Sequence, residues 1–145
     1  MAGAAPLKGS CMCGACTFTA VPAAGGGANV CHCKMCQKWA AGMYMAVDCG
    51  NSVVFDDLAH VGSYKGSAWG ERLFCKTCGS SLVWQMQGGA GQGVAMHAFD
   101  DPAQFVLKNQ WFIDKKPDNY ALTNQTRNLT EAETIAAFAP GGGHQ

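Results

Sequence analysis

The hydrophobic pattern of the chain is dominated by short runs in which apolar and polar residues alternate. Residues 15–21 alternate so that Cys16, Phe18 and Ala20 share one face, and residues 43–47 alternate in the same way. A two-residue period is typical of a β-strand with one buried face. The pattern therefore predicts a mainly β protein, with further strands at residues 52–55, 61–64, 72–74, 81–85, 94–99 and 110–113.

Two segments carry helical signals instead. Residues 34–41 form a short candidate helix, and Thr130 followed three residues later by Glu133 fits a capping box before an apolar run. We expect a C-terminal helix over about residues 130–138, followed by a frayed, glycine-rich tail.

The composition is short of the large residues that usually build a hydrophobic core. Val, Ile, Leu and Phe number 25 in a chain of 145 residues, which also contains 19 glycines and 9 cysteines. When these four residue types fall below about 20% of the chain, an additional source of stability is expected. No linker divides the sequence, so we expect one domain, residues 1–145, with a core over about 8–120. The cysteines are the candidate source of the missing stability.

Charge and hydropathy disfavour several classes of protein. Ten basic residues balance ten acidic ones, and a net charge of zero disfavours a basic surface for nucleic acid. No run approaches the roughly 18 apolar residues of a membrane span, and residues 1–10 lack the apolar stretch of a secretory signal. We therefore expect a cytoplasmic protein with no nucleic-acid or membrane partner. In that compartment, clustered cysteines indicate metal or redox sites rather than disulfides.

All but one of the cysteines fall into close groups. The first triplet is Cys11, Cys13 and Cys16, the second is Cys31, Cys33 and Cys36, and the pair is Cys75 and Cys78. A C-x-C segment places two sulfurs on one face of an extended chain, and C-x-x-C wraps a tight turn around a metal ion. Four such thiolates make a closed, structural zinc site, whereas three leave an open position that is typical of catalytic zinc. A three-thiolate zinc carries a charge of about −1 and suits a soft fourth ligand such as a substrate thiol.

Spacing alone leaves the assignment of the groups open. The two triplets share one C-x-C-x-x-C pattern, so either can keep the open position while the other is completed by Cys75 and Cys78. A site of three thiolates can also be closed by Cys49, Cys16 or a histidine, which would make it a second structural site. Cys49 is more simply interpreted as a small hydrophobic residue beside a turn. His32 alternates away from the cysteines on either side of it and is not expected to be a ligand.

Three cysteine motifs follow one another in a specific order along the chain. They are GSCMCG at residues 9–14, CHCKMC at 31–36 and ERLFCKTCGS at 71–80. Together with DDP at 100–102 and FIDKKP at 112–117, this order resembles the glutathione-dependent formaldehyde-activating enzyme family. The resemblance extends over most of the chain, from about residue 8 to residue 120.

The resemblance implies a small β-tent fold that is stapled by zinc and carries short helices. It implies two zinc ions per chain: a structural ion on Cys11, Cys13, Cys75 and Cys78, and a catalytic ion on Cys31, Cys33 and Cys36. The implied activity is that of a carbon-sulfur lyase on S-hydroxymethylglutathione, so glutathione or a similar thiol is the expected small-molecule partner. Because the family also contains relatives of centromere protein V, the alternative is a non-catalytic interaction or chaperone-like module with both zinc sites closed.

Several other residues are weaker candidates for the site. Trp39 and Tyr44 closely follow the second triplet and can line a pocket over the metal, with plain core packing as the alternative. His97 lies in the predicted strand 94–99, where a core histidine is the commoner role and substrate binding the second possibility. Gln110 stands where many relatives have histidine, and its role is left open. No side chain stands out as a general base, and the remaining tryptophans are expected in the core: Trp69, Trp84 and Trp111.

Overall fold

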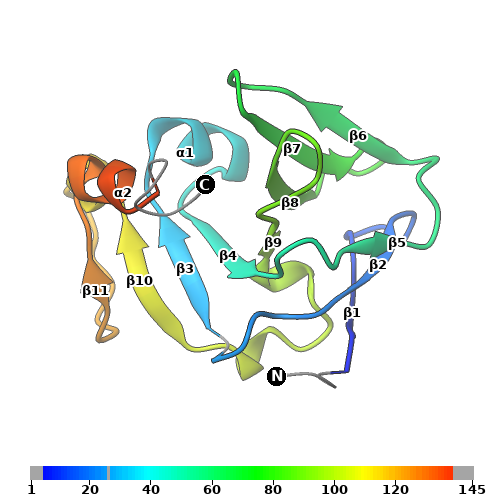
Figure 1. The fold of residues 1–145 in the computed structure, drawn as a ribbon, viewed down its shortest axis with the longest axis horizontal. Helices are drawn as coiled ribbons and strands as arrows, with labels where there is room; N and C mark the ends of the chain where they lie inside the picture. The colour runs from blue at the N-terminus through cyan, green and yellow to red at the C-terminus, as the bar shows by residue number, and fades with distance from the viewer. Residues whose placement is uncertain (1–4, 26, 139–145) are drawn as a thin grey trace.

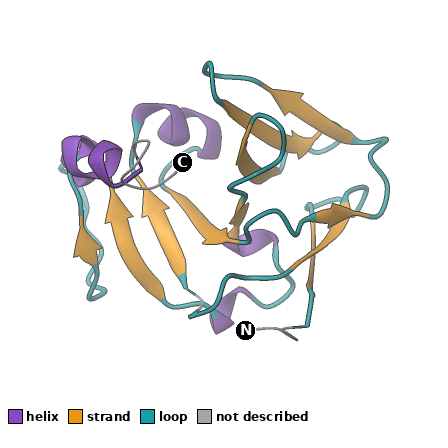
Figure 2. Ribbon diagram, viewed as in Figure 1, coloured by secondary structure: helices purple, strands orange, loops and turns teal. Residues whose placement is uncertain are grey.

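Strands make up most of the regular structure in the computed structural model, which describes residues 5–25 and 27–138 (Figure 1; Figure 2). One sheet has the strand order β1-β2-β5, and the other has the order β11-β10-β3-β4-β9-β8-β7-β6. The prediction of a mainly β fold with short helices is confirmed. The strands are β1 (Leu7–Ser10), β2 (Thr17–Ala20), β3 (Ala28–Cys31), β4 (Tyr44–Asp48), β5 (Val54–Phe55), β6 (Val61–Tyr64), β7 (Gly70–Cys75), β8 (Ser81–Met86), β9 (Gly93–Ala95), β10 (Leu107–Trp111) and β11 (Arg127–Asn128).

The helical segments are short and lie at the ends of strands. The α-helices are α1 (Lys34–Ala40) and α2 (Glu131–Phe138), and the 3-10 turns are η1 (Met96–Ala98), η2 (Pro102–Gln104) and η3 (Ile113–Lys115). The predicted capping box at α2 is present: the Thr130 N–H donates to Glu133 Oε1 at 2.9 Å, and the Glu133 N–H donates to Thr130 Oγ1 at 3.2 Å. The predicted frayed tail at 139–145 lies outside the described residues. Within those residues, no helix is long and apolar enough to cross a membrane.

The alternating runs in the sequence locate most of the strands. β6 coincides with the predicted residues 61–64, and Cys16, Phe18 and Ala20 are buried together, as the alternation in residues 15–21 predicts. Strands β1, β3 and β11 were not anticipated. Each has four residues or fewer and carries at most one large aliphatic side chain, so the hydrophobic period gives no signal there.

Two predicted strands end earlier than the sequence pattern indicates. β9 stops at Ala95, and the chain turns through η1 before Phe99 bridges Gly9 of the smaller sheet. His97 therefore lies exposed on a 3-10 turn, and its prediction as a mid-strand core residue is wrong. β10 stops at Trp111 because Phe112 takes a left-handed conformation, with φ of 56°, and starts η3.

The main core collects buried side chains from both sheets. Phe18 of β2 is 1% exposed and makes edge contacts with Phe55 and Phe99, at ring-centroid distances of 5.9 and 5.7 Å. Any side chain at Gly9 would collide with the Phe18 ring and the Ala98 carbonyl, so glycine permits this close approach of β1. Cys16 and Cys49 are buried in the same core, which matches the small hydrophobic role expected of them.

The tryptophans do not lie where the sequence predicted. Trp69 is 47% exposed, so its assignment to the core is wrong. Trp111 is only partly buried, and Trp84 is partly buried and packs against the smaller core cluster of Cys36, Tyr44 and Ala46. The main core is instead built from Phe, Val, Leu, Ala and Cys side chains. The three large indoles are therefore held at the surface of a hollow rather than inside a packed layer.

Substitution of Phe18 by alanine tests this description of the core. We expect Phe18→Ala to lower the free energy of unfolding by about 3–5 kcal/mol, because a fully buried aromatic ring is replaced by a cavity. Urea unfolding in excess zinc measures this change. The control is Leu58→Ala, whose side chain is 69% exposed and whose effect should stay within about 0.5 kcal/mol. Equal effects for the two variants would contradict this view of the core.

Candidate functional site

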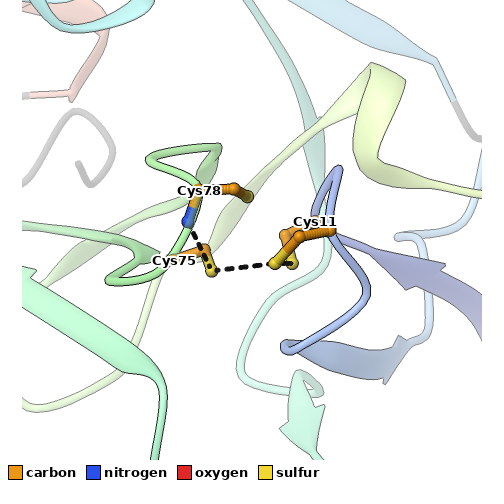
Figure 3. A group of neighbouring side chains, drawn as sticks. Cys11, Cys75 and Cys78 are labelled. Atoms are coloured by element: carbon orange, nitrogen blue, oxygen red, sulfur yellow. Dashed lines mark hydrogen bonds between the residues drawn. The ribbon is translucent and has the colours of Figure 1, made fainter.

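Four cysteine sulfurs converge between two loops that are distant in the sequence. Cys11 and Cys13 lie between β1 and β2, whereas Cys75 ends β7 and Cys78 lies on the turn that follows it, facing Cys11 (Figure 3). We call these four residues the quartet; their sulfurs all lie within 4.8 Å of one another. Sγ of Cys13 is 3.7 Å from that of Cys11 and 3.9 Å from that of Cys75. These separations match the roughly 3.8 Å between sulfurs of a tetrahedral zinc site with 2.3 Å bonds.

Backbone donors surround the quartet. The N–H of Cys16 donates to Cys11 Sγ at 3.2 Å, and the N–H groups of Thr77 and Cys78 donate to Cys75 Sγ at 3.3 and 3.4 Å. Such hydrogen bonds stabilise a thiolate, and those of Cys78 and Thr77 lower the pKa of Cys75. Gly79 closes this turn with a φ of 83°, a left-handed conformation that glycine adopts without strain.

Ser80 joins the two loops of the quartet. Its hydroxyl accepts from the Met12 N–H at 3.0 Å and lies 3.2 Å from Cys78 Sγ. Hydrogen bonding from Ser80 lowers the pKa of the Cys78 thiol to about 5. Cys75 and Cys78 are therefore prepared to present thiolates, which is the form that binds a metal ion, whereas desolvation and the neighbouring thiols raise the pKa of Cys13 to about 11.

A second group of sulfurs forms at the start of α1. Cys31 ends β3, Cys33 is the N-cap of α1 and accepts from the Cys36 N–H at 3.3 Å, and Cys36 lies in the first turn. We call these three residues the trio; their sulfurs also lie within 4.8 Å of one another. No fourth cysteine, histidine or carboxylate of the described residues joins the trio within that distance. The trio can therefore hold a metal ion with one position left for another ligand.

The loop that carries the trio is anchored by neutral polar contacts. His32 is fully buried, and its Nε2 lies 2.8 Å from Oε1 of Gln110 on β10. Gln110 in turn donates to Thr126 Oγ1 at 2.9 Å. Gln37 of α1 donates to the carbonyls of His32 and Lys115, at 2.6 and 2.9 Å. Gln110 and Gln37 are thus positioning residues, and His32 is turned away from the metal group as the alternation predicted.

The three thiols of the trio oppose one another's ionisation, which indicates that the group needs a compensating cation. Hydrogen bonding from Cys31 lowers the pKa of Cys33, while hydrogen bonding to Cys33 raises the pKa of Cys31. One thiolate in the trio therefore opposes ionisation of the next, and a divalent cation removes that opposition. Arg72 supplies part of the compensation: its buried guanidinium directs Nη2 at Cys36 Sγ, 3.7 Å away.

The two remaining cysteines take no part in either group. Burial raises the pKa of both Cys16 and Cys49 to about 12, so each stays a neutral thiol. The first triplet thus contributes two sulfurs to the quartet and keeps Cys16 in the core. The geometry resolves the ambiguity left by the shared spacing: Cys75 and Cys78 lie with Cys11 and Cys13, and the second triplet forms the separate trio.

The trio forms part of the wall of a cavity of about 430 Å³. Cavities of this size bind small molecules in other proteins. Six aromatic side chains contribute to the rest of the wall: Tyr44, Trp69, Trp84, Trp111, Phe112 and Phe138. Across the sheet, Cys31 pairs with Tyr44 on β4 and with Trp111 on β10, so two of these rings flank the first sulfur of the trio.

The weaker candidates from the sequence have different positions. Tyr44 lines the cavity, and its hydroxyl donates to the Gly93 carbonyl at 2.6 Å. Trp39 does not line the cavity but packs against Tyr44, with ring centroids 4.9 Å apart, and lies under the Arg72 guanidinium. His97 lines a separate hollow beside Cys11. The tryptophans of the wall were missed as site residues because their positions depend on long-range pairing.

Comparisons with known proteins agree with this geometry. The sequence model of the glutathione-dependent formaldehyde-activating enzyme family matches residues 6–115. A Schizosaccharomyces pombe protein named as an uncharacterized lyase is 30% identical over 135 residues, which cover 90% of this chain and 96% of that protein. A Halomonas elongata protein, provisionally named a glutathione-dependent formaldehyde-activating enzyme, is 33% identical over 84 residues, or 52% of this chain and 54% of its own.

A crystal structure of a Rhodobacter sphaeroides protein shares the fold. Its TM-score is 0.57 at 21% sequence identity, and the superposition covers 70% of this chain and 98% of that one. The motifs that suggested the resemblance in sequence, at residues 9–14, 31–36 and 71–80, all lie inside the region matched by the family model. The chain therefore belongs to the glutathione-dependent formaldehyde-activating enzyme family.

Proposed function

We propose that this protein is a zinc-dependent lyase that cleaves the carbon-sulfur bond of a thiol adduct such as S-hydroxymethylglutathione. The single observation that carries the proposal is the trio, which lies on a cavity and has no fourth protein ligand among the described residues. The family, and the relative named as a lyase, support the assignment to lyases. The identity of the thiol and of the carbonyl compound is part of the proposal.

The two cysteine groups would divide the roles of zinc. The quartet would hold a structural ion, because its four sulfurs complete a tetrahedral site, and the trio would hold the catalytic one. Zinc at the trio would lower the pKa of a thiol and stabilise the thiolate that leaves when the carbon-sulfur bond breaks. The chain itself would supply the position of the ion and the charge balance of this step.

Arg72 is the charge-balancing residue of the proposed centre. Its side chain is 5% exposed, its guanidinium lies 5.4 Å from the Trp39 ring centroid, and its Nε has no hydrogen-bond partner among the described residues. The ion pair found in that part of the chain joins Lys115 to Glu131 and leaves Arg72 without a carboxylate. Three thiolates and a divalent ion sum to about −1, which the guanidinium offsets.

Proton transfer is left to solvent in this proposal. Glu131 lines the cavity but is paired with Lys115 at 3.2 Å, and no carboxylate or imidazole of the described residues hydrogen-bonds to the trio. The hydroxyl proton of the adduct would pass to water as the carbonyl forms. This agrees with the absence of an obvious general base in the sequence.

The alternative function is a non-catalytic zinc module used for interactions or as a chaperone. That function needs both metal sites to be closed by protein ligands. The geometry favours the lyase, because Cys49 and Cys16, the sulfurs that were candidates to close the second site, belong to the core and not to the trio.

Substitution of a trio cysteine tests the catalytic assignment. Cys33→Ser should reduce the zinc content from about two to about one per chain and abolish carbon-sulfur cleavage, while the fold is retained. Elemental analysis, circular dichroism and an assay of aldehyde release measure these three effects. Cys49→Ala is the matched control and should keep both ions. Global unfolding of Cys33→Ser, or an unchanged zinc content, would contradict the assignment.

Substitution in the quartet should have the opposite signature. Cys75→Ser should lose the cooperative fold together with its metal, because a structural zinc contributes on the order of 10 kcal/mol to folding. Thermal unfolding and amide hydrogen exchange provide the measurement. A Cys75→Ser protein that keeps the wild-type melting temperature would show that the quartet is not structural.

Removal of the Arg72 charge should weaken metal binding at the trio alone. We expect Arg72→Met to lower zinc affinity there by about 10–100-fold, in the range found for residues that support metal ligands. Competition with a chromophoric chelator measures both sites in one titration. The control is Arg127→Met, at an exposed arginine of β11. An unchanged affinity in Arg72→Met would exclude the charge-balancing role.

A further inference from the structure

The wall of the cavity is more hydrophobic than a one-carbon substrate requires. Its volume is about 430 Å³, whereas a molecule of the size of water takes up about 30 Å³ in the liquid. Formaldehyde has one carbon, so the group that fills the space must come from a larger part of the ligand. The aromatic residues of the wall indicate the chemical nature of that group.

Two aromatic pairs reach the cavity from different strands. Trp69 and Trp84 belong to the β7–β8 side and make an edge contact at 5.6 Å, while Trp111 of β10 makes one with Phe138 of α2 at 4.8 Å. In the strand order, β3, β4 and β9 lie between β10 and β8. The two pairs therefore come from separate parts of the sheet and leave the hollow between them.

Two small residues leave space on the strands between those pairs. Ala46 of β4 and Gly93 of β9 both lie in the wall, and a Cβ added at Gly93 would come within 3.2 Å of the Ala46 methyl. A larger residue at either position would project into the space. The small residues between the two aromatic pairs leave a slot, in which a ligand would contact the faces and edges of the rings.

The charged groups of the wall are few and mostly engaged. Lys115 pairs with Glu131 at 3.2 Å, and Arg72 is directed at Cys36. Lys34 and Asp48 are exposed. A polar thiol such as glutathione would therefore keep its charged ends near exposed residues such as Lys34, and only an uncharged, hydrophobic group would be stabilised between the rings.

We propose that the cavity binds a thiol adduct carrying an aromatic ring, or a comparably bulky hydrophobic group, next to the scissile carbon-sulfur bond. This inference rests on the proposed lyase function and deepens it by naming a hydrophobic group that the thiol or the carbonyl part of the adduct carries. In the step, the carbon-sulfur bond breaks and its electron pair leaves with sulfur as a thiolate. The O–H pair becomes the second carbonyl bond, and the hydroxyl proton passes to water, so no oxidant or reductant is needed.

Family membership does not decide against a larger substrate. The match to the family model ends at residue 115, whereas Glu131, Thr134 and Phe138 of α2 also line the cavity. Part of the wall thus comes from a segment outside the matched region. The rest of the wall, including the trio, lies inside the matched region.

Binding of two stable thioethers tests the proposal without catalysis. S-benzylglutathione should bind at least tenfold more tightly than S-methylglutathione to the zinc-loaded protein, measured by calorimetry and by quenching of tryptophan fluorescence. Trp69→Ala should reduce this ratio at least threefold. The matched control, Tyr64→Ala, removes an exposed ring that does not line the cavity and should leave the ratio unchanged. Equal affinities of the two thioethers for the wild-type protein would overturn the proposal.

The rate of aldehyde release then shows whether the thiol or the carbonyl part of the adduct carries the hydrophobic group. The substrates are the glutathione adduct of phenylglyoxal, the formaldehyde adduct of benzyl thiol and the glutathione adduct of formaldehyde, each with a trap for the free aldehyde. Faster release from either ring-bearing adduct supports the proposal and identifies the carbonyl or the thiol as the source of the ring. Fastest release from the formaldehyde adduct of glutathione would overturn it. If no adduct is cleaved, the lyase function fails, and the thioether ratio still decides whether the cavity selects a ring.

Discussion

The convergence of four sulfurs between the β1–β2 loop and the β7–β8 turn is the constraint on which the rest of the structure depends. It joins the three-stranded sheet to the eight-stranded sheet in a chain that has few large aliphatic residues to pack. Backbone N–H groups already point at Cys11 and Cys75, so the loops are shaped for thiolates rather than for thiols. A metal ion at this point would fix the relative positions of the two sheets and, with them, the hairpin that carries Trp84.

The trio is held by a different kind of contact. The His32–Gln110 hydrogen bond anchors its loop to β10, and Gln37 anchors it through the carbonyls of His32 and Lys115. Neither contact uses a sulfur. The sulfurs are therefore positioned without being enclosed, which leaves a side of the group that meets the cavity. The quartet has its four ligands from two loops, whereas the trio has its three from one short segment. Because two loops contribute to the quartet and only one segment contributes to the trio, the quartet has four metal ligands and the trio has three.

The sequence allowed the fold class and the cysteine groups to be predicted because both are local properties. Alternation marked β2 and β6, and the C-x-C and C-x-x-C spacings marked which sulfurs share a turn. The pairing of Cys75 with the first triplet came from the family resemblance, since spacing did not distinguish the triplets. The partner of His32 could not be predicted, because β10 reaches β3 by a parallel pairing between residues far apart in the chain. The prediction that Trp69 lies in the core failed for a related reason. The size and hydrophobicity of a side chain predict its burial on average, but they do not predict which face of a sheet remains open.

The positions of the tryptophans connect stability to function. A chain with so few aliphatic residues would gain stability by packing its indoles into the core, yet Trp69, Trp84 and Trp111 surround a hollow instead. Side chains that line an apolar cavity make fewer dispersion contacts with the rest of the protein than side chains in a packed core. Such a cavity needs another interaction to supply the stability, and a metal cross-link at the quartet would be one that leaves the cavity wall untouched. A structural ion at one group of cysteines would thereby permit an open, aromatic surface beside the other, as expected where stability and activity are opposed.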